Sequence, residues 1–328
     1  MAKTIRIGTR GSRLALWQAE RTRDLLQSFH RNLQIEIVPI KSQGDEWQQQ
    51  KVQDLGTVGI FTREIERALL DGQVDVAVHS LKDLPTESPP ELMLSALLER
   101  DDPRDALIAT ALRGFEDANP RAALSALPRA ARIGTSSLRR QAQLLRARPD
   151  IEVVDLRGNV PTRLAKVEEG ELDGILLSSA GLDRLGLRPV GCVRLDPEIM
   201  LPAPAQGTIA VQVRADDREI HAVVSRADHR PTRLTTTAER MLLHALHGGC
   251  RVPLGALARL DGDTLTLRAR LLAIDGRTML ASSATGPASH VRILAQQVAD
   301  ELLAQGGAEI LATLRPPAGG AHPGTPQA

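Results

Sequence analysis

The sequence predicts an α/β protein that consists of two similar lobes and a small C-terminal α+β domain. Strand and helix patterns alternate in two successive sets, and from about residue 230 the pattern changes to strands joined by hairpin turns. Strands that alternate with helices form parallel sheets covered on both faces, so two such sets predict a two-lobed clamp. The chain has 328 residues, which is long enough for two or three domains with cores of their own.

The first set has expected strands at residues 5–8, 35–38 and 74–78, and expected helices at 14–29 and 61–70. Between them, residues 42–59 are polar and glycine-containing, which predicts a long loop of the kind that covers a site. The second set follows the charged stretch 99–103. Its strand patterns lie near residue 133 and at 151–155 and 175–177, and its helix patterns lie at 137–147, at 160–168 and from residue 180.

The third region is expected to begin with a helix at residues 236–247, capped by a run of threonines. Strands at 254–260, 265–274 and 278–283, joined by Asp-Gly turns, precede a helix at 291–303. We therefore expect a first lobe of residues 1–100 and 203–227, a second lobe of 104–200, a third domain of 230–316 and a disordered tail of 317–328.

Composition narrows the functional classes. The formal net charge is +1, so nothing global predicts binding to nucleic acid or to an anionic membrane. No apolar stretch approaches the roughly 20 residues of a membrane span, and the N-terminal residues lack the apolar region of a secretory signal. Two cysteines, Cys192 and Cys250, do not make a disulfide framework. We therefore expect a cytoplasmic protein.

Arginines at strand ends and helix starts are the main functional signal. Only five of the 41 basic residues are lysines; base composition of the genome accounts for the excess as a whole, but not for where particular arginines lie. Guanidinium groups and the N–H groups of helix starts bind carboxylates and phosphates, which predicts a small polyanionic ligand. These arginines are Arg10, Arg139, Arg140, Arg157, Arg163 and Arg184.

A carboxylate, Asp83, follows the buried strand at 74–78, together with Ser80 and Lys82. It could form a plain loop ion pair with Lys82. Alternatively, it could point into the cleft to meet a cationic or N–H-bearing substrate, and cationic neighbours would keep it ionised. The residues alone leave both interpretations open.

Cys250 is flanked by Gly248, Gly249 and Arg251, which favours an accessible thiol with thiolate character. Two alternatives stay open. The cysteine could be structural, or it could share a metal ion with His244 and His247, although no fourth ligand is evident and the glycine pair interrupts the helix. Cys192 has apolar neighbours, which indicates an inert side chain.

Seven motifs together resemble those of the porphobilinogen deaminase (hydroxymethylbilane synthase) family, in order and in spacing, from about residue 4 to residue 313. They are Thr9-Arg10-Gly11-Ser12 with Leu14-Ala15-Leu16-Trp17-Gln18, His79-Ser80-Leu81-Lys82-Asp83-Leu84-Pro85, Arg100-Asp101-Asp102-Pro103-Arg104-Asp105, Gly134-Thr135-Ser136-Ser137-Leu138-Arg139-Arg140, Leu156-Arg157-Gly158-Asn159, Ala180-Gly181-Leu182-Asp183-Arg184-Leu185 and Gly248-Gly249-Cys250.

This resemblance implies a fold of two lobes like those of periplasmic binding proteins plus a third domain that carries the cofactor cysteine. It implies that Cys250 holds a dipyrromethane cofactor through a thioether, with no metal. Four molecules of porphobilinogen are then joined head to tail with loss of ammonia, and hydroxymethylbilane is released by hydrolysis. The family also implies a monomer.

By the same resemblance, Asp83 matches the catalytic carboxylate, which contacts pyrrole N–H groups and stabilises the cation that develops on the substrate. The arginines match positions that bind the acetate and propionate groups of the pyrrole rings, for which a planar guanidinium is better suited than an ammonium. The implied cofactor-binding residues are Ser12, Ser80, Lys82, Asp83, Thr135, Ser137, Arg139, Arg140 and Cys250. The implied substrate-binding residues are Arg10, Ser12, Arg157, Arg163 and Arg184.

One departure from the family lies in the expected loop, where many relatives have lysines and this chain has Asp54 and Val58. Hinges are expected near residues 99–104 and 199–206. Two rival functions remain at this point. A two-lobed binding protein for a small dicarboxylate would explain the arginines but not Cys250, and a metal-dependent hydrolase would explain Cys250 but not the arginines.

Overall fold

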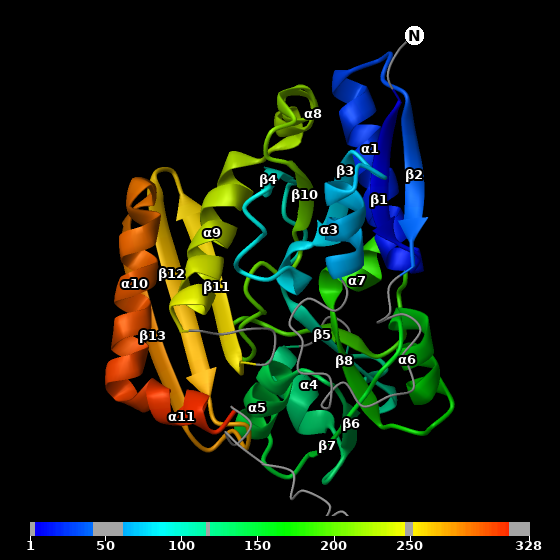
Figure 1. Ribbon diagram of the computed structural model, residues 1–328. Helices are drawn as coiled ribbons and strands as arrows, with labels where there is room; N and C mark the ends of the chain where they lie inside the picture. The colour runs from blue at the N-terminus through cyan, green and yellow to red at the C-terminus, as the bar shows by residue number, and fades with distance from the viewer. Residues whose placement is uncertain (1–3, 42–61, 116–118, 247–251, 315–328) are drawn as a thin grey trace, which may run out of the picture.

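The computed structural model describes residues 4–41, 62–115, 119–246 and 252–314, and in it three sheets form the framework (Figure 1). The sheets have the strand orders β2-β1-β3-β10-β4, β7-β6-β8-β5-β9 and β11-β12-β13. The strands are β1 Ile5–Arg10, β2 Ile35–Ile40, β3 Val76–Ser80, β4 Leu92–Leu97, β5 Asp105–Ala109, β6 Arg132–Gly134, β7 Glu152–Val154, β8 Gly174–Ser178, β9 Cys192–Arg194, β10 Ile209–Arg214, β11 Leu254–Asp261, β12 Thr264–Leu272 and β13 Met279–Pro287. The helices of more than one turn are α1 Arg13–Phe29, α3 Arg63–Leu70, α4 Pro120–Ala126, α5 Leu138–Ala147, α6 Val160–Glu168, α7 Ser179–Arg184, α8 Arg218–Val224, α9 Arg230–Ala245, α10 Val291–Leu302 and α11 Ala308–Ala312.

The first two sheets have the same arrangement of strand directions. In the first sheet, β1 is parallel to β2 and β3, whereas β10 is antiparallel to β3 and β4. In the second, β6 is parallel to β7 and β8, whereas β5 is antiparallel to β8 and β9. The prediction of two similar α/β lobes is confirmed, but the sheets are mixed rather than parallel. Buried strands are apolar throughout in either direction, so their pattern does not reveal how they are oriented.

Helices cover both faces of the first sheet, as expected for an α/β lobe. Helix α1 packs on one face with Ile5, Ile7 and Val78 in a shared core, and α3 packs on the other face with Ala77. The predicted helices at 14–29 and 160–168 correspond to α1 and α6. Both begin at a side-chain cap that satisfies a free backbone N–H group, because Ser12 accepts from Ala15 and Asn159 accepts from Thr162.

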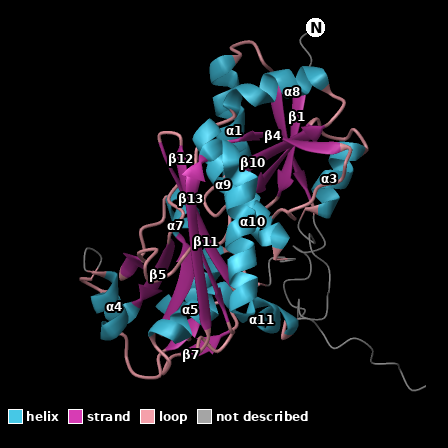
Figure 2. Ribbon diagram, turned by 90° about the vertical axis from the view of Figure 1, so that its left-hand side faces the viewer, coloured by secondary structure: helices cyan, strands magenta, loops and turns pink. Residues whose placement is uncertain are grey.

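The third sheet is antiparallel, and α9 and α10 pack against it to enclose a separate core (Figure 2). The predicted start of the first of these helices is wrong, because α9 begins at Arg230 and not at residue 236. The threonines lie inside the helix. Thr235 and Thr236 donate their hydroxyl groups to the carbonyl oxygens of Pro231 and Thr232, as threonines commonly do in helix interiors. A threonine run therefore does not mark the cap here.

Within the described residues, no helix combines the length and the apolar character that crossing a membrane requires.

Candidate active site

The carboxyl ends of β1 and β3 meet at one edge of the first sheet, because the two strands are parallel neighbours. The Ser12 hydroxyl lies at this edge and accepts a hydrogen bond from the Ala15 N–H group at 3.3 Å, which caps α1. A small cavity of about 80 Å³ opens here. Its lining residues come from β1, α1, α3 and β3 and are Arg10, Ser12, Leu14, Ala15, Gln18, Thr62, Ile65, Val78, His79, Ser80 and Asp83.

Gln18 is a site residue that the functional interpretation of the sequence missed. Its side-chain amide lies 3.0 Å from the Ser80 hydroxyl, and Gln18 itself is buried on the inner face of α1. A polar residue on the apolar face of an amphipathic helix is the signal that could have identified it. The pair holds the Ser80 hydroxyl in place at the mouth of the cavity.

Asp83 is exposed at the end of a single 3-10 turn, Leu81–Asp83, which follows β3 directly. Its neighbour Lys82 donates from Nζ to Gln206 Oε1 at 3.2 Å. Burial lowers the pKa of Lys82 to about 8; Asp83 attracts the charged form and opposes this shift, whereas Arg140 adds to it. Lys82 thus belongs to a larger charge cluster, and a simple loop ion pair with Asp83 does not describe it.

Arg139 and Arg140 lie at the equivalent edge of the second sheet, and both bind one buried carboxylate. Arg139 Nη1 is 2.6 Å from Asp105 Oδ2, and Arg140 Nε is 2.9 Å from Asp105 Oδ1. The same guanidinium groups also donate to the carbonyl oxygens of Leu201 and Leu176. Burial alone would raise the pKa of Asp105, but attraction by the two arginines outweighs it and holds this pKa well below its ordinary value.

The hydroxyl groups predicted next to these arginines shape the start of α5. Thr135 Oγ1 accepts from the Ser137 N–H group at 3.2 Å, and Ser137 Oγ accepts from the Arg140 N–H group at 3.5 Å. Thr135 is buried, whereas Ser137 is partly exposed. In the structure these hydroxyls therefore cap the helix that presents Arg139 and Arg140.

Arg184 connects the segments that run between the two lobes. Its Nε lies 2.8 Å from Asp101 Oδ2, and its Nη2 donates to the Gly207 carbonyl oxygen at 2.7 Å. Asp101 lies in the segment near 99–104, where the chain crosses from the first lobe to the second, and Gly207 lies just after the segment near 199–206, where it crosses back. We call these two stretches the crossing segments. The Asp101 N–H group also donates to the Gly207 carbonyl oxygen. Arg184 is thus buried at the junction of the lobes and holds the two crossing segments together.

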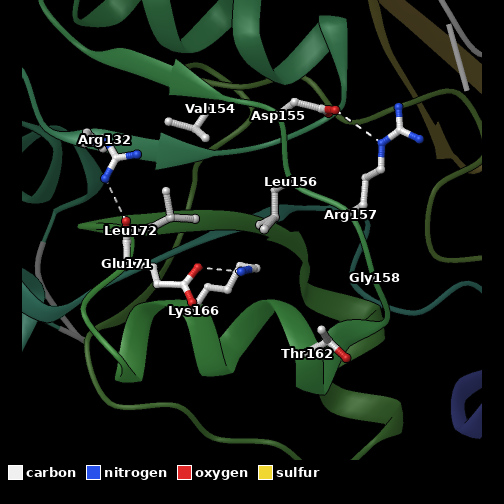
Figure 3. A pocket seen from close by; sticks show the side chains of 10 residues that line it. All are labelled: Arg132, Val154, Asp155, Leu156, Arg157, Gly158, Thr162, Lys166, Glu171 and Leu172. Carbon is white, nitrogen blue, oxygen red and sulfur yellow. Dashed lines mark hydrogen bonds and ion pairs between the residues drawn. The ribbon is translucent and has the colours of Figure 1, made fainter. Parts of the chain in front are cut away.

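Arg157 and Arg163 flank the start of α6. Arg163 Nε donates to the Gly158 carbonyl oxygen at 2.7 Å, and Arg157 Nε lies 3.2 Å from Asp155 Oδ2. Figure 3 shows Arg157 among the residues that line a hollow of about 490 Å³, with its guanidinium group directed toward Asp155. In that hollow, Lys166 is paired with the Glu171 carboxylate.

Asp83 lies close enough to several arginines of the second lobe to affect their pKa values. Burial lowers the pKa of Arg163 to about 10, and attraction by Asp83 is among the effects that oppose this shift. Burial also lowers the pKa of Arg140 and of Arg184, and Asp83 opposes both shifts. One carboxylate from the first lobe therefore faces cations of the second lobe and of the junction.

A second buried ion pair fastens the third domain to both crossing segments. Glu239 on α9 is fully buried and accepts from Arg100 at 2.7 and 3.0 Å. It also accepts from the backbone N–H groups of Ala205 and Ala258. This junction was not predicted, because its ion pair joins Arg100 and Glu239, which lie 139 positions apart in the chain.

Two of the three residues of the alternative metal site, His247 and Cys250, lie outside the described residues, as do the predicted loop at 42–59 with Asp54 and Val58 and the predicted tail at 317–328. His244 is described, and its Nδ1 lies 3.7 Å from the Glu87 carboxylate. Cys192 packs in β9 beside an apolar cluster, as its neighbours indicated.

Two family models match the chain. Residues 5–222 match the porphobilinogen deaminase, dipyromethane cofactor binding domain, and residues 233–304 match the porphobilinogen deaminase, C-terminal domain. A porphobilinogen deaminase of Syntrophomonas wolfei subsp. wolfei is 45% identical over 313 residues, with 95% of this chain and 99% of that protein covered. A porphobilinogen deaminase of Xanthomonas axonopodis pv. citri is 47% identical over 312 residues, with the same coverage.

The likenesses to solved structures are more distant. The BenM effector binding domain with its effector benzoate has a TM-score of 0.43 and 19% identity, with 69% of this chain and 92% of that chain covered. A putative periplasmic sulfonate-binding protein, SsuA, from Methylobacillus flagellatus KT has a TM-score of 0.39 and 14% identity, with 74% and 69% covered. The matches to the family models, and not these likenesses, carry the conclusion that follows.

Proposed function

The chain belongs to the porphobilinogen deaminase family, and on that premise we propose that Asp83 is its catalytic carboxylate and Cys250 the attachment point of its cofactor. Porphobilinogen deaminase activity with a dipyrromethane cofactor, in tetrapyrrole biosynthesis, is the activity of this family. The observation that supports the assignment of Asp83 is its exposed place in the lining of the cavity, beside Ser12 and Ser80, where it also attracts arginines of the second lobe.

The described residues fit a dipyrromethane by the chemistry of their side chains. Its rings carry carboxylates, which need cations, and pyrrole N–H groups, which need an acceptor. Asp105 is one carboxylate shared by two guanidinium groups, so Arg139, Arg140 and Asp105 together keep a net positive charge. Lys82 lies within the same cluster. Lys82, Arg139, Arg140, Thr135 and Ser137 would hold the carboxylates.

When bound, the dipyrromethane supplies the free pyrrole α-carbon to which the first substrate molecule is joined. Asp83 accepts hydrogen bonds from the pyrrole N–H groups and stabilises the positive charge that develops on porphobilinogen as ammonia departs. Arg10, Ser12, Arg157, Arg163 and Arg184 orient the substrate by its acetate and propionate groups. Ser80, held by Gln18, lies beside Asp83 and assists in this binding.

The domain ranges follow from the same proposal. The first lobe, residues 1–100 and 203–227, presents Asp83; the second, 104–200, presents the arginines; and the third, 230–316, carries the tether. The segments near 99–104 and 199–206, where the chain crosses between the lobes, are the proposed hinges. A monomeric state and a cytoplasmic location remain predictions.

Replacement of Asp83 tests the assignment. Asp83→Asn keeps the shape but removes the charge, so kcat should fall by about 100-fold to 1000-fold, the loss found when one transition-state partner is removed. Asp83→Glu should also cripple turnover, because it moves the charge by one methylene. The melting temperature should not change, because Asp83 is exposed. Glu87→Gln, an exposed carboxylate on the following loop, is the control. Near-normal turnover in Asp83→Asn would remove this residue from the mechanism.

A further inference from the structure

The turn that carries Asp83 is held from outside by an arginine of the third domain. Arg240 lies on α9, and its guanidinium group donates to four backbone carbonyl oxygens around this turn. Nη1 is 3.3 Å from the Leu81 oxygen and 3.1 Å from the Leu84 oxygen. Nη2 is 2.7 Å from the Pro85 oxygen and 3.4 Å from the Thr86 oxygen.

The turn is also held from within the first lobe, where the Leu81 N–H group donates to the Thr208 carbonyl oxygen at 2.9 Å. It is a single 3-10 turn, closed by the Leu84 N–H group donating to the Leu81 oxygen at 3.3 Å. The Leu81 and Leu84 side chains are buried, and they anchor both sides of a segment whose tip, Asp83, is exposed. Buried carbonyl oxygens need donors, and a guanidinium is the one side chain that offers several donors in a rigid plane. Arg240 therefore sets the path of the backbone on both sides of Asp83.

Arg240 is preceded on α9 by Glu239, which contacts both crossing segments. Glu239 binds Arg100 at one of them and the Ala205 N–H group at the other. In Figure 1, α9 lies between the third sheet and β4 of the first lobe. In the sequence, Cys250 follows this helix. One helix thus fixes the catalytic turn, contacts both crossing segments and leads to the tether.

We propose that Arg240 is a positioning residue for the reaction: by binding the carbonyl oxygens on both sides of Asp83, it holds that carboxylate in register with the chain tethered to the third domain. The inference rests on the proposed role of Asp83. Arg240 acts through the backbone and does not touch the reacting atoms. A misplaced catalytic group lowers the rate of the chemical step more than it lowers the affinity for substrate.

The test compares two arginine-to-lysine substitutions on the same helix. Arg240→Lys keeps the positive charge, but an ammonium cannot span four carbonyl oxygens. Arg233→Lys is the matched control, because Arg233 also binds the first lobe, through the Leu94 and Ser95 carbonyl oxygens, both at 3.2 Å, and it pairs with the Asp228 carboxylate just after that lobe. Each variant is purified as holoenzyme, and kcat, KM for porphobilinogen and the melting temperature are measured.

We expect Arg240→Lys to lower kcat by about 10-fold to 100-fold with KM changed less than about twofold, the pattern of a misplaced catalytic group. Arg233→Lys should leave kcat within about twofold at a comparable loss of melting temperature. The inference is overturned if kcat falls equally in the two variants, or if Arg240→Lys raises KM alone.

Asp83→Asn, measured alongside, distinguishes a failure of the positioning role of Arg240 from a failure of the proposed function. If Asp83→Asn is inactive while Arg240→Lys is normal, the positioning role fails and the proposed function stands. If Asp83→Asn is active, both fail.

Discussion

The two lobes have matching sheets, yet their corresponding edges carry different chemistry. At the edge of the first lobe, Asp83 is exposed and Ser80 is held by a neutral partner, Gln18. At the edge of the second, Arg139 and Arg140 are buried against Asp105. One fold thus presents a reactive carboxylate on one side and an internally supported cation cluster on the other. The lesson is that strand topology places a site, while the buried partners of its side chains decide what each edge can do.

The strongest test of this difference between the edges is to remove Asp105, the carboxylate that supports the arginines of the second lobe. Asp105→Asn leaves two buried guanidinium groups without a counter-charge and should lower the free energy of unfolding by about 3–5 kcal/mol. Urea denaturation of the purified variant measures this. Asp155→Asn, an exposed carboxylate in the same lobe, is the control. A loss below about 1 kcal/mol, the range of exposed ion pairs, would mean that Asp105 does not support the arginines.

Low pH should destabilise the folded protein through the same carboxylate, Asp105. The pKa of Asp105 is depressed in the folded protein, so its contribution to stability is present above its unfolded pKa and is lost as the pH falls through the acid range. The wild-type protein should therefore lose more stability than Asp105→Asn between pH 5 and pH 3, in titrations by urea denaturation. Parallel curves for the two proteins would contradict this.

Measurements of KM and melting temperature should distinguish the role of Arg157 from that of Arg139 within the second lobe. Arg157 is partly exposed and paired with an exposed carboxylate, so Arg157→Ala should raise KM by about tenfold, the loss of a charge-assisted hydrogen bond, with little change in melting temperature. Arg139→Ala should lower the melting temperature as well, because Arg139 binds Asp105 and the Leu201 carbonyl oxygen. Arg188→Ala, which removes an exposed arginine, is the control for charge. An equal fall in melting temperature in Arg157→Ala and Arg139→Ala would contradict this difference between the two arginines.

Lys82 tests the comparison through the pH dependence of stability, because its charge interacts with charged groups of both edges, Asp83 on one side and Arg139, Arg140 and Asp105 on the other. Its pKa is lowered to about 8 from 10.5, so between these values the unfolded chain binds a proton that the folded protein does not. Stability should therefore rise with pH across this window. Lys82→Met should remove that rise, measured by denaturation from pH 7.5 to pH 10.5 against wild type. An unchanged slope would show that Lys82 keeps an ordinary pKa.

The sequence predicted the elements whose evidence is local. The helix patterns at 14–29 and 160–168 depend on residues a few positions apart, and both helices form where expected, each behind a side-chain cap that was not predicted. The start of α9 was wrong because Thr235 and Thr236 bond to their own helix and not to its free N–H groups. Neither β5 nor β10 was among the predicted strands, so their antiparallel pairing was missed with them; a buried apolar strand also reads the same in either direction.

The site shows the same division between local and distant evidence. The motifs located Asp83, Ser80 and the arginines at strand ends, because sheet topology determines which ends meet. They could not reveal that Asp105 binds Arg139 and Arg140, or that Gln206 binds Lys82, since these contacts join residues far apart in the chain. The four carbonyl contacts of Arg240 are equally invisible in the sequence, because backbone acceptors leave no residue pattern.

The most direct test of the account is the intact mass of the purified protein before and after incubation with porphobilinogen. Wild-type protein should carry the added mass of two condensed pyrrole units, and further units should appear on incubation. Cys250→Ser should carry none, and Asp83→Asn, supplied with preassembled cofactor, should carry the first two units without extending them. An unmodified wild-type chain that stays unmodified after incubation would contradict the account.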